Sequence, residues 1–200
     1  MRIIKEKKEV HKDLFIRHIK TEEKINEKEF IINLIMRYAL AFLFSLGSFW
    51  IFYVVFTPLT FYPSALILKI LYNATIEAPF ILLGKYTVFI DKACVAGSAY
   101  FLMFLINMAT HGISWPKRIK IVLLNFGSLL ILNILRIGFL AILLLTLPGL
   151  YDVTHFIFWH FVSTVFVIAI WLFTLKAYKI EGIPFFSDWL IVKNMIKKKR

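Results

Sequence analysis

Cysteine is nearly absent from this chain of 200 residues, which contains a single one, Cys94. One thiol excludes an intramolecular disulfide framework and any cysteine-rich metal site. Carboxylates are scarce within the long apolar runs, and there is no His-Glu-x-x-His pattern, which argues against a metal-dependent intramembrane protease. We therefore expect a protein whose chemistry needs neither a metal ion nor another cofactor.

Charge is also missing from several long runs, whereas 60% of all residues are hydrophobic. A soluble domain is about 45–50% apolar, and about 20 apolar residues allow a helix to cross the hydrocarbon core of a bilayer. The sequence therefore predicts an all-α integral membrane protein. The net charge of +12 does not indicate nucleic-acid binding, because most of the charges lie at the chain ends and in one short loop.

About four transmembrane helices are expected. They cover residues 31–56, 93–113, 119–147 and 154–175. Pro58 and Pro63 are expected to end the first of these helices. Residues 64–76 are apolar but too short to span, which favours an interfacial or re-entrant segment. Residues 80–90 are β-branched and aromatic around Gly84, which favours a small extracytoplasmic hairpin.

Polar residues gather outside these spans. We expect residues 1–30 to form a polar cytoplasmic N-terminal segment, 31–178 a membrane-embedded domain, and 179–200 a basic, partly amphipathic cytoplasmic tail. Nine basic residues precede the first span, three lie in 114–120 and seven follow the last span, against three in 57–92. The positive-inside rule then places both termini and the 114–120 loop on the cytoplasmic side.

Arg136 is the most informative single residue, because it lies within the third expected span. An arginine there cannot reach the cytoplasm and costs on the order of several kcal/mol if it is unpaired. Asn133 lies on the same helical face three residues earlier, and Gly138 allows another helix to approach. At a rise of 1.5 Å per residue, Arg136 lies roughly 16 Å below the outer edge. A functional charge and a buried pairing that only fixes helix packing are the two interpretations.

Cys94 begins the second expected span, at the same outer boundary. A lone membrane cysteine is often only a small hydrophobe. The small residues that follow it, among them Gly97, leave its face open to a substrate or to another helix. The N-terminal end of a helix favours a thiolate, and Lys92 is adjacent. Cys94 is therefore a candidate nucleophile.

Two histidines of the fourth expected span compete for one role. His155 starts this span at the outer boundary, and Asp152, three residues earlier, is a candidate to orient its imidazole. His160 lies about one and a half turns deeper and points about 140° away. Its alternative role is that of a hydrogen-bonded interior histidine, and Asp152 serves equally well as a turn residue. Ser98 and Ser163 are alternative nucleophiles, but the sequence shows no general base for either of them.

Three blocks of the sequence resemble the signature blocks of the exosortase/archaeosortase family. They read "ACVAGSAYFLMFLIN", "LNILRIGFLAILLL" and "HFIFWHFVSTVFVIAIW". The resemblance covers roughly 93–172 and includes a Cys-x-x-Gly element at Cys94–Gly97 and an Asn-x-x-Arg element at Asn133–Arg136. The compact chain and its "CVAGSAY" stretch look more like small archaeosortases than bacterial exosortases. Members of this family are multi-pass membrane transpeptidases that cleave C-terminal sorting signals from surface proteins.

The resemblance implies that Cys94 is the nucleophile, that Arg136 stabilises the oxyanion or the substrate carbonyl, and that a histidine is the third catalytic residue. We favour His155 for that role and keep His160 as the alternative. The supporting residues are Asn133, Gly97 and Asp152. The expected substrates are membrane-anchored surface proteins, the acceptor is a lipid or another nucleophile, and the active site faces the extracytoplasmic side of the cell membrane.

The competing hypothesis is a non-enzymatic multi-pass membrane component, either a transporter or an assembly subunit. In that case Arg136 pairs with a partner helix or binds an anion.

Overall fold

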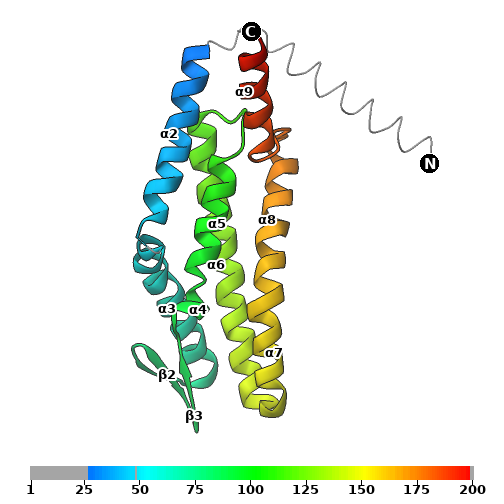
Figure 1. Cartoon of the computed structure of the whole chain (residues 1–200). Helices are drawn as coiled ribbons and strands as arrows, with labels where there is room; N and C mark the ends of the chain where they lie inside the picture. Colours follow the sequence, from blue (N-terminus) through cyan, green and yellow to red (C-terminus); the bar gives the residue numbers. More distant parts are fainter. Residues whose placement is uncertain (1–26, 48, 199–200) are drawn as a thin grey trace, which may run out of the picture. The chain divides into compact units, whose positions relative to one another are not determined.

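The structure is a computed structural model, and it describes residues 27–47 and 49–198 (Figure 1). The chain divides into two compact units, Met1–Arg37 and Tyr38–Arg200. Helix α2 (Glu27–Ser45) begins in the first unit, and every later element belongs to the second. The expected segment 1–30 lies almost wholly outside the described residues.

Helices dominate the described residues, which confirms the predicted helical class. Three of the described helices are long and apolar enough to cross a membrane: α3 (Trp50–Tyr72), α6 (Trp115–Thr146) and the helical run Pro148–Ala177. These helices are compatible with a membrane location.

The first apolar region differs from the single helix expected over 31–56. Helix α2 ends at Ser45, and α3 begins at Trp50. Phe49, immediately before α3, has a φ of 62°, a left-handed conformation that interrupts a right-handed helix. The expectation of one continuous helix is therefore wrong.

The expected break at Pro58 and Pro63 is also wrong, because both prolines lie inside α3. Each proline removes one backbone donor at a cost of about 3 kcal/mol in a helix interior. In an apolar environment, an irregular backbone with several unpaired groups costs more than that. Residues 64–72 thus form the last turns of α3, and the interfacial or re-entrant segment expected over 64–76 does not form.

A three-stranded antiparallel sheet follows α3 and confirms the hairpin expected over 80–90. Strand β2 (Phe80–Leu83) pairs with β3 (Tyr86–Phe89) across a turn at Gly84, which has a φ of 61°. Strand β1 (Thr75–Glu77), which was not predicted, pairs with the other edge of β2. The strand order is therefore β1-β2-β3, with β3 at one edge.

The second expected span, 93–113, consists of two shorter helices. The one-turn helix α4 (Lys92–Val95) is separated from α5 (Gly97–Met108) by Ala96, whose φ is 58°. The left-handed residue between them changes the direction of the chain. Cys94 consequently lies in a separate turn and not at the start of a long helix.

The third expected span is helical, as predicted, but its helix α6 starts earlier than expected and includes most of the expected 114–120 loop. Pro116 fits this start because a helix needs no backbone donor in its first turn. Arg118 is buried, and its guanidinium donates hydrogen bonds to the carbonyls of Asn107, Thr110 and Ile113. It therefore satisfies carbonyls at the C-terminal end of α5 and is not a solvated loop charge.

The fourth expected span is also helical and starts earlier than 154. A single 3-10 turn, η1 (Pro148–Leu150), leads into α7 (Tyr151–Ile157), a π-helical turn, η2 (Phe158–Val162), and α8 (Ser163–Ala177). The tail forms α9 (Phe186–Lys198). One side of α9 buries Ser187, Asp188 and Ile191, whereas Trp189 and Lys193 are exposed, so the helix is amphipathic.

Aromatic side chains from α3, α5 and α6 pack together in the core. Phe56 stacks on Tyr100 with ring centroids 3.5 Å apart, and Phe126 meets both rings edge-on. Such pairs contribute about 0.5–1.5 kcal/mol each beyond their burial. Asn125 of α6 also accepts a hydrogen bond from Thr174 of α8. These contacts hold α3, α5 and α8 against α6, the helix that carries Asn133 and Arg136.

Candidate active site

Cys94 lies in the single turn of α4, directly after β3. Asp91 precedes this turn, and its Oδ1 accepts hydrogen bonds from the N–H groups of Ala93, at 2.9 Å, and Cys94, at 3.2 Å. Asp91 is therefore a side-chain N-cap. Its carboxylate offsets the positive end of the short helix. The helix N-terminus therefore does not stabilise a Cys94 thiolate in the way that the sequence led us to expect.

Gly97 is required by the packing of α4 and α5 against α3. A Cβ atom at this position would lie 2.6–2.9 Å from ring carbons of Tyr53. Since real Cβ contacts are longer than this, only glycine fits without movement of the ring. Gly97 therefore allows close packing beside the turn that carries Cys94, and its supporting role in the site stays a prediction.

Asn133 and Arg136 both hold the backbone of α4. The side-chain amide of Asn133 donates to the carbonyls of Cys94, at 2.7 Å, and Val95, at 3.3 Å. The Nη2 of Arg136 donates to the carbonyls of Ala93, at 3.3 Å, and Cys94, at 3.1 Å. A one-turn helix leaves its carbonyls without intrahelical partners, and these two side chains supply the donors.

Arg136 also joins α6 to the next helical run. Its Nη1 donates to Oγ of Ser163 at 2.8 Å, and that hydroxyl donates to the carbonyl of Phe158 at 2.9 Å. Phe158 begins the π-helical turn η2, and such turns often occur at functional sites. Arg136 thus connects α4, α6 and the start of α8.

The positive charge of Arg136 is buried and not neutralised by a carboxylate of the described residues. The side chain is only 7% exposed, and its Nε has no hydrogen-bond partner. A buried guanidinium favours an anion or a strongly polarised oxygen as its partner. The arrangement therefore suits a ligand whose oxygen carries or develops negative charge.

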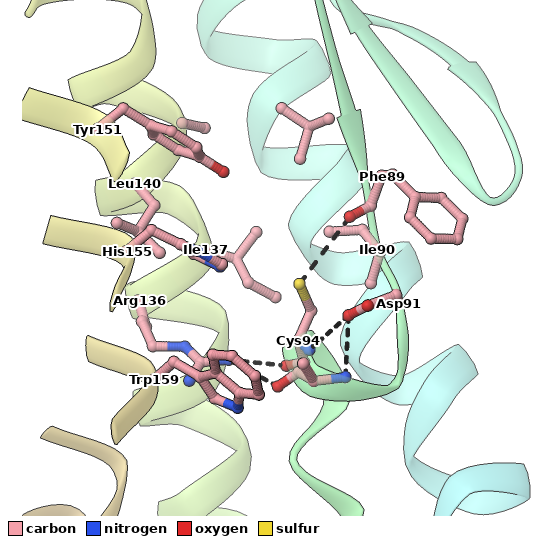
Figure 2. A pocket seen from close by; sticks show the side chains of 13 residues that line it. Phe89, Ile90, Asp91, Cys94, Arg136, Ile137, Leu140, Tyr151, His155 and Trp159 are labelled. Atoms are coloured by element: carbon pink, nitrogen blue, oxygen red, sulfur yellow. Dashed lines mark hydrogen bonds between the residues drawn. The ribbon is translucent and has the colours of Figure 1, made fainter. Parts of the chain in front are cut away.

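A cavity of about 220 Å³ lies next to these groups, and Cys94, Arg136 and His155 all line it (Figure 2). The other lining residues are Val88, Phe89, Ile90, Asp91, Ala93, Ile137, Leu140, Ala141, Tyr151 and Trp159. Figure 2 shows Cys94 on one side of this space, below β3, and Arg136 and His155 on the side of α6 and α7. Residues separated by more than 60 positions in the sequence thus share one site.

The two candidate histidines differ in their surroundings. His155 is partly buried and stacks on Tyr151, with ring centroids 5.6 Å apart and an interplanar angle of 7°. His160 is exposed, packs against Phe156 and has its Nδ1 3.0 Å from the Phe156 carbonyl oxygen. Only His155 of these two lines the cavity with Cys94. The geometry therefore favours His155 over His160.

Asp152 is exposed, and no hydrogen bond joins it to His155 within the part of the chain that the structure describes. Tyr151, which sequence reasoning did not single out, contacts the His155 ring instead. Asp91 was also missed, although an aspartate directly before a short helical turn is a recognisable N-cap signal. Tyr151 has a weaker signal, its spacing of four residues from His155.

No three His, Cys, Asp or Glu side chains of the described residues are grouped so that they would hold a metal ion. The expectation that the chemistry needs no metal or cofactor stays a prediction.

The chain matches no family model, no curated protein and no solved structure with significance. The resemblance to exosortases and archaeosortases therefore depends on the three sequence blocks.

Proposed function

We propose that this protein is a membrane-embedded cysteine transpeptidase of the exosortase/archaeosortase kind, which cleaves C-terminal sorting signals from surface proteins. The observation that supports it most directly is that Cys94, Arg136 and His155, from three separate elements, line one cavity (Figure 2). Acyl transfer needs a nucleophile, a proton carrier and stabilisation of the oxyanion, and a thiol, an imidazole and a buried guanidinium can supply these three roles.

In the first step, the sulfur of Cys94 attacks the scissile carbonyl carbon while His155 accepts the thiol proton. The tetrahedral intermediate carries a negative oxygen, which the buried charge and unpartnered Nε–H of Arg136 stabilise. The C–N bond then breaks, and the imidazolium of His155 returns its proton to the departing amine. The products of this step are an amine-terminated tail and a thioester on Cys94.

In the second step, an acceptor amine or hydroxyl attacks the thioester carbon and transfers its proton to His155. The C–S bond breaks, and the Cys94 thiolate recovers that proton. The surface protein is then joined to the acceptor, a lipid or another nucleophile. Exclusion of water from the cavity favours this transfer over hydrolysis.

We further propose that α3, α4–α5, α6 and the α7–α8 run are the four spans, with both termini cytoplasmic and the cavity on the extracytoplasmic side. Support comes from the three long apolar helices and from the excess of basic residues near the chain ends. A substrate anchored by its own transmembrane helix would reach the cavity already oriented.

The test compares C-terminal peptides of membrane proteins, by mass spectrometry, between cells with the wild-type protein and cells with Cys94→Ala at equal abundance. We expect a set of surface proteins to keep hydrophobic C-terminal tails only in the variant. Ser98→Ala is the matched control, because Ser98 is four residues from Cys94 in the sequence, is exposed and does not line the cavity. Identical C-termini in wild-type and Cys94→Ala cells would contradict the proposal.

A non-catalytic membrane component is the second candidate, since one observation favours it too. Asn133 and Arg136 donate hydrogen bonds to carbonyls of α4, and Arg136 also donates to Ser163. A purely architectural role would use the same contacts. This candidate predicts that Cys94→Ala retains function and that Arg136→Lys is partly tolerated.

A further inference from the structure

Strand β3 has one edge that pairs with no other described strand. The sheet order is β1-β2-β3, so only the β2 side of β3 is paired. An unpaired edge presents backbone N–H and C=O groups that readily accept another extended chain. The same strand contributes Val88 and Phe89 to the lining of the Cys94 cavity.

The register shows which residues of β3 face outward. The N–H of Ile90 donates to the Pro79 carbonyl at 3.2 Å, and Ile81 is opposite Val88. In an antiparallel ladder, hydrogen-bonded pairs alternate with pairs whose backbone groups point away from each other. Val88 and Ile90 therefore bond toward β2, and the backbone groups of Thr87 and Phe89 point toward the free edge.

The contact of Phe89 with the candidate nucleophile agrees with this alternation. Its carbonyl oxygen accepts a hydrogen bond from Sγ of Cys94 at 3.9 Å, away from β2 (Figure 2). The free edge of β3 thus ends beside the sulfur. A peptide aligned along this edge would bring one of its own carbonyl groups close to Cys94 and Arg136.

We propose that the free edge of β3 binds the cleavage-site segment of the substrate as an added extended strand. This inference rests on the proposed function, and it names the mode in which that site takes its peptide. The Thr87 and Phe89 backbone groups would bond to alternate residues of the segment. The cavity is smaller than the 300–1,000 Å³ typical of small-molecule sites, so it suits one side chain and the scissile carbonyl of a peptide.

The first test uses Thr87→Pro, which removes an outward N–H but no hydrogen bond of the β2–β3 ladder. The matched control is Ile76→Pro, because the β1–β2 register makes the Ile76 N–H point outward at the opposite edge of the sheet. Thr87→Ala controls for the side chain. The readout is the rate at which tails are removed from the substrates that the Cys94→Ala comparison identifies.

We expect Thr87→Pro to slow tail removal about tenfold, which corresponds to the loss of one backbone hydrogen bond to the substrate. Ile76→Pro and Thr87→Ala should remove tails at rates within about twofold of the wild-type rate, because neither change takes away a backbone hydrogen bond to the substrate. The alkylation rate of Cys94, the sole thiol, reports whether each variant keeps its fold around the site. A wild-type rate of tail removal in Thr87→Pro would overturn the strand-addition proposal. An equal loss of rate in Ile76→Pro would also overturn it.

A second measurement does not depend on how well a proline variant folds. Synthetic peptides with the identified cleavage sequence carry a single backbone N-methyl group at successive positions and are processed by the wild-type protein. Strand addition predicts strong inhibition at every second position, because only alternate N–H groups face β3. Uniform effects along the peptide would overturn it. If Cys94→Ala leaves all C-termini unchanged, the proposed function fails instead.

Discussion

The two buried arginines of α6 both donate hydrogen bonds to backbone carbonyls, Arg118 from the first turn of the helix and Arg136 from its second half, but only Arg136 lines the cavity beside Cys94. Arg118 donates to the carbonyls of Asn107, Thr110 and Ile113, and it caps α5. Arg136 donates to the carbonyls of Ala93 and Cys94 in α4. An arginine that satisfies backbone carbonyls is therefore not in itself a sign of catalysis.

The two arginines differ in the groups that surround them. Near Arg136 lie the only thiol of the chain, a partly buried histidine and a cavity of about 220 Å³. Near Arg118 lie Trp115, whose ring is 5.7 Å from the guanidinium carbon, and the end of α5. The first turn of α6 therefore only satisfies carbonyls of the fold, whereas its second half also lies beside a thiol, a histidine and a cavity. Four predictions test this contrast.

The largest effect is expected at the histidine beside the thiol. His155→Ala should slow tail removal by about 100-fold to 10,000-fold, because it removes the group that accepts and returns the proton in the proposed mechanism. His160→Ala changes an exposed histidine of the same helical run and should leave the rate within about twofold, since it moves no proton. The measurement is the fraction of substrate that retains its tail. A larger loss in His160→Ala would reverse the assignment.

Next in size is a matched pair of lysine substitutions in α6. Arg136→Lys keeps the charge but loses the planar fork, and it should slow tail removal by about 100-fold to 1,000-fold. Arg118→Lys should leave this rate nearly unchanged and instead lower thermal stability, since carbonyls at the end of α5 lose donors. Equal activity losses in both variants would mean that Arg136 is only a structural clamp.

A smaller effect is expected from crowding beside α4. Gly97→Ala would place a Cβ 2.6 Å from the Tyr53 ring and should destabilise the fold by about 2 kcal/mol. In a Tyr53→Ala background, the same change should cost far less, because the obstructing ring is gone. Thermal unfolding in detergent measures both. Additive losses in the double variant would show that the ring is not the obstacle.

The smallest effect is expected at the cap of α4. Asp91→Ala should destabilise this turn by about 1 kcal/mol, because the N–H groups of Ala93 and Cys94 lose their acceptor. Asp91→Asn keeps an acceptor oxygen and should retain most of that stability. The alkylation rate of Cys94 reports local opening, and it should rise in Asp91→Ala more than in Asp91→Asn. No difference between the two variants would contradict a capping role.

The positions of the polar residues within apolar segments were predictable from the sequence. Polar side chains in such helices turn inward, and helical rise fixes their depth. These rules predicted that Cys94, Arg136 and His155 lie in one region, and all three line one cavity. The rules did not reveal that Arg136 donates to the backbone of α4, because that contact depends on the packing of distant segments.

The helix boundaries near the N-terminal half were harder to predict. Proline propensity suggested breaks at Pro58 and Pro63, but α3 continues through both, and the actual interruption precedes Trp50. Local propensity is a weak guide where an apolar environment favours continuous helical hydrogen bonding. Ala96 has a left-handed φ without a glycine to signal it, so the division between α4 and α5 left no trace in the sequence.

The most direct test of the central claim is to trap the acyl intermediate on Cys94. Protein that is actively removing tails is quenched in acid, digested and analysed by mass spectrometry of the peptide that contains Cys94. The proposed mechanism predicts a substrate-derived acyl group on this thiol, absent from a Cys94→Ser control and released by hydroxylamine as expected for a thioester. A Cys94 peptide that carries only a free thiol, in a preparation whose Cys94→Ala variant removes tails equally fast, would contradict it.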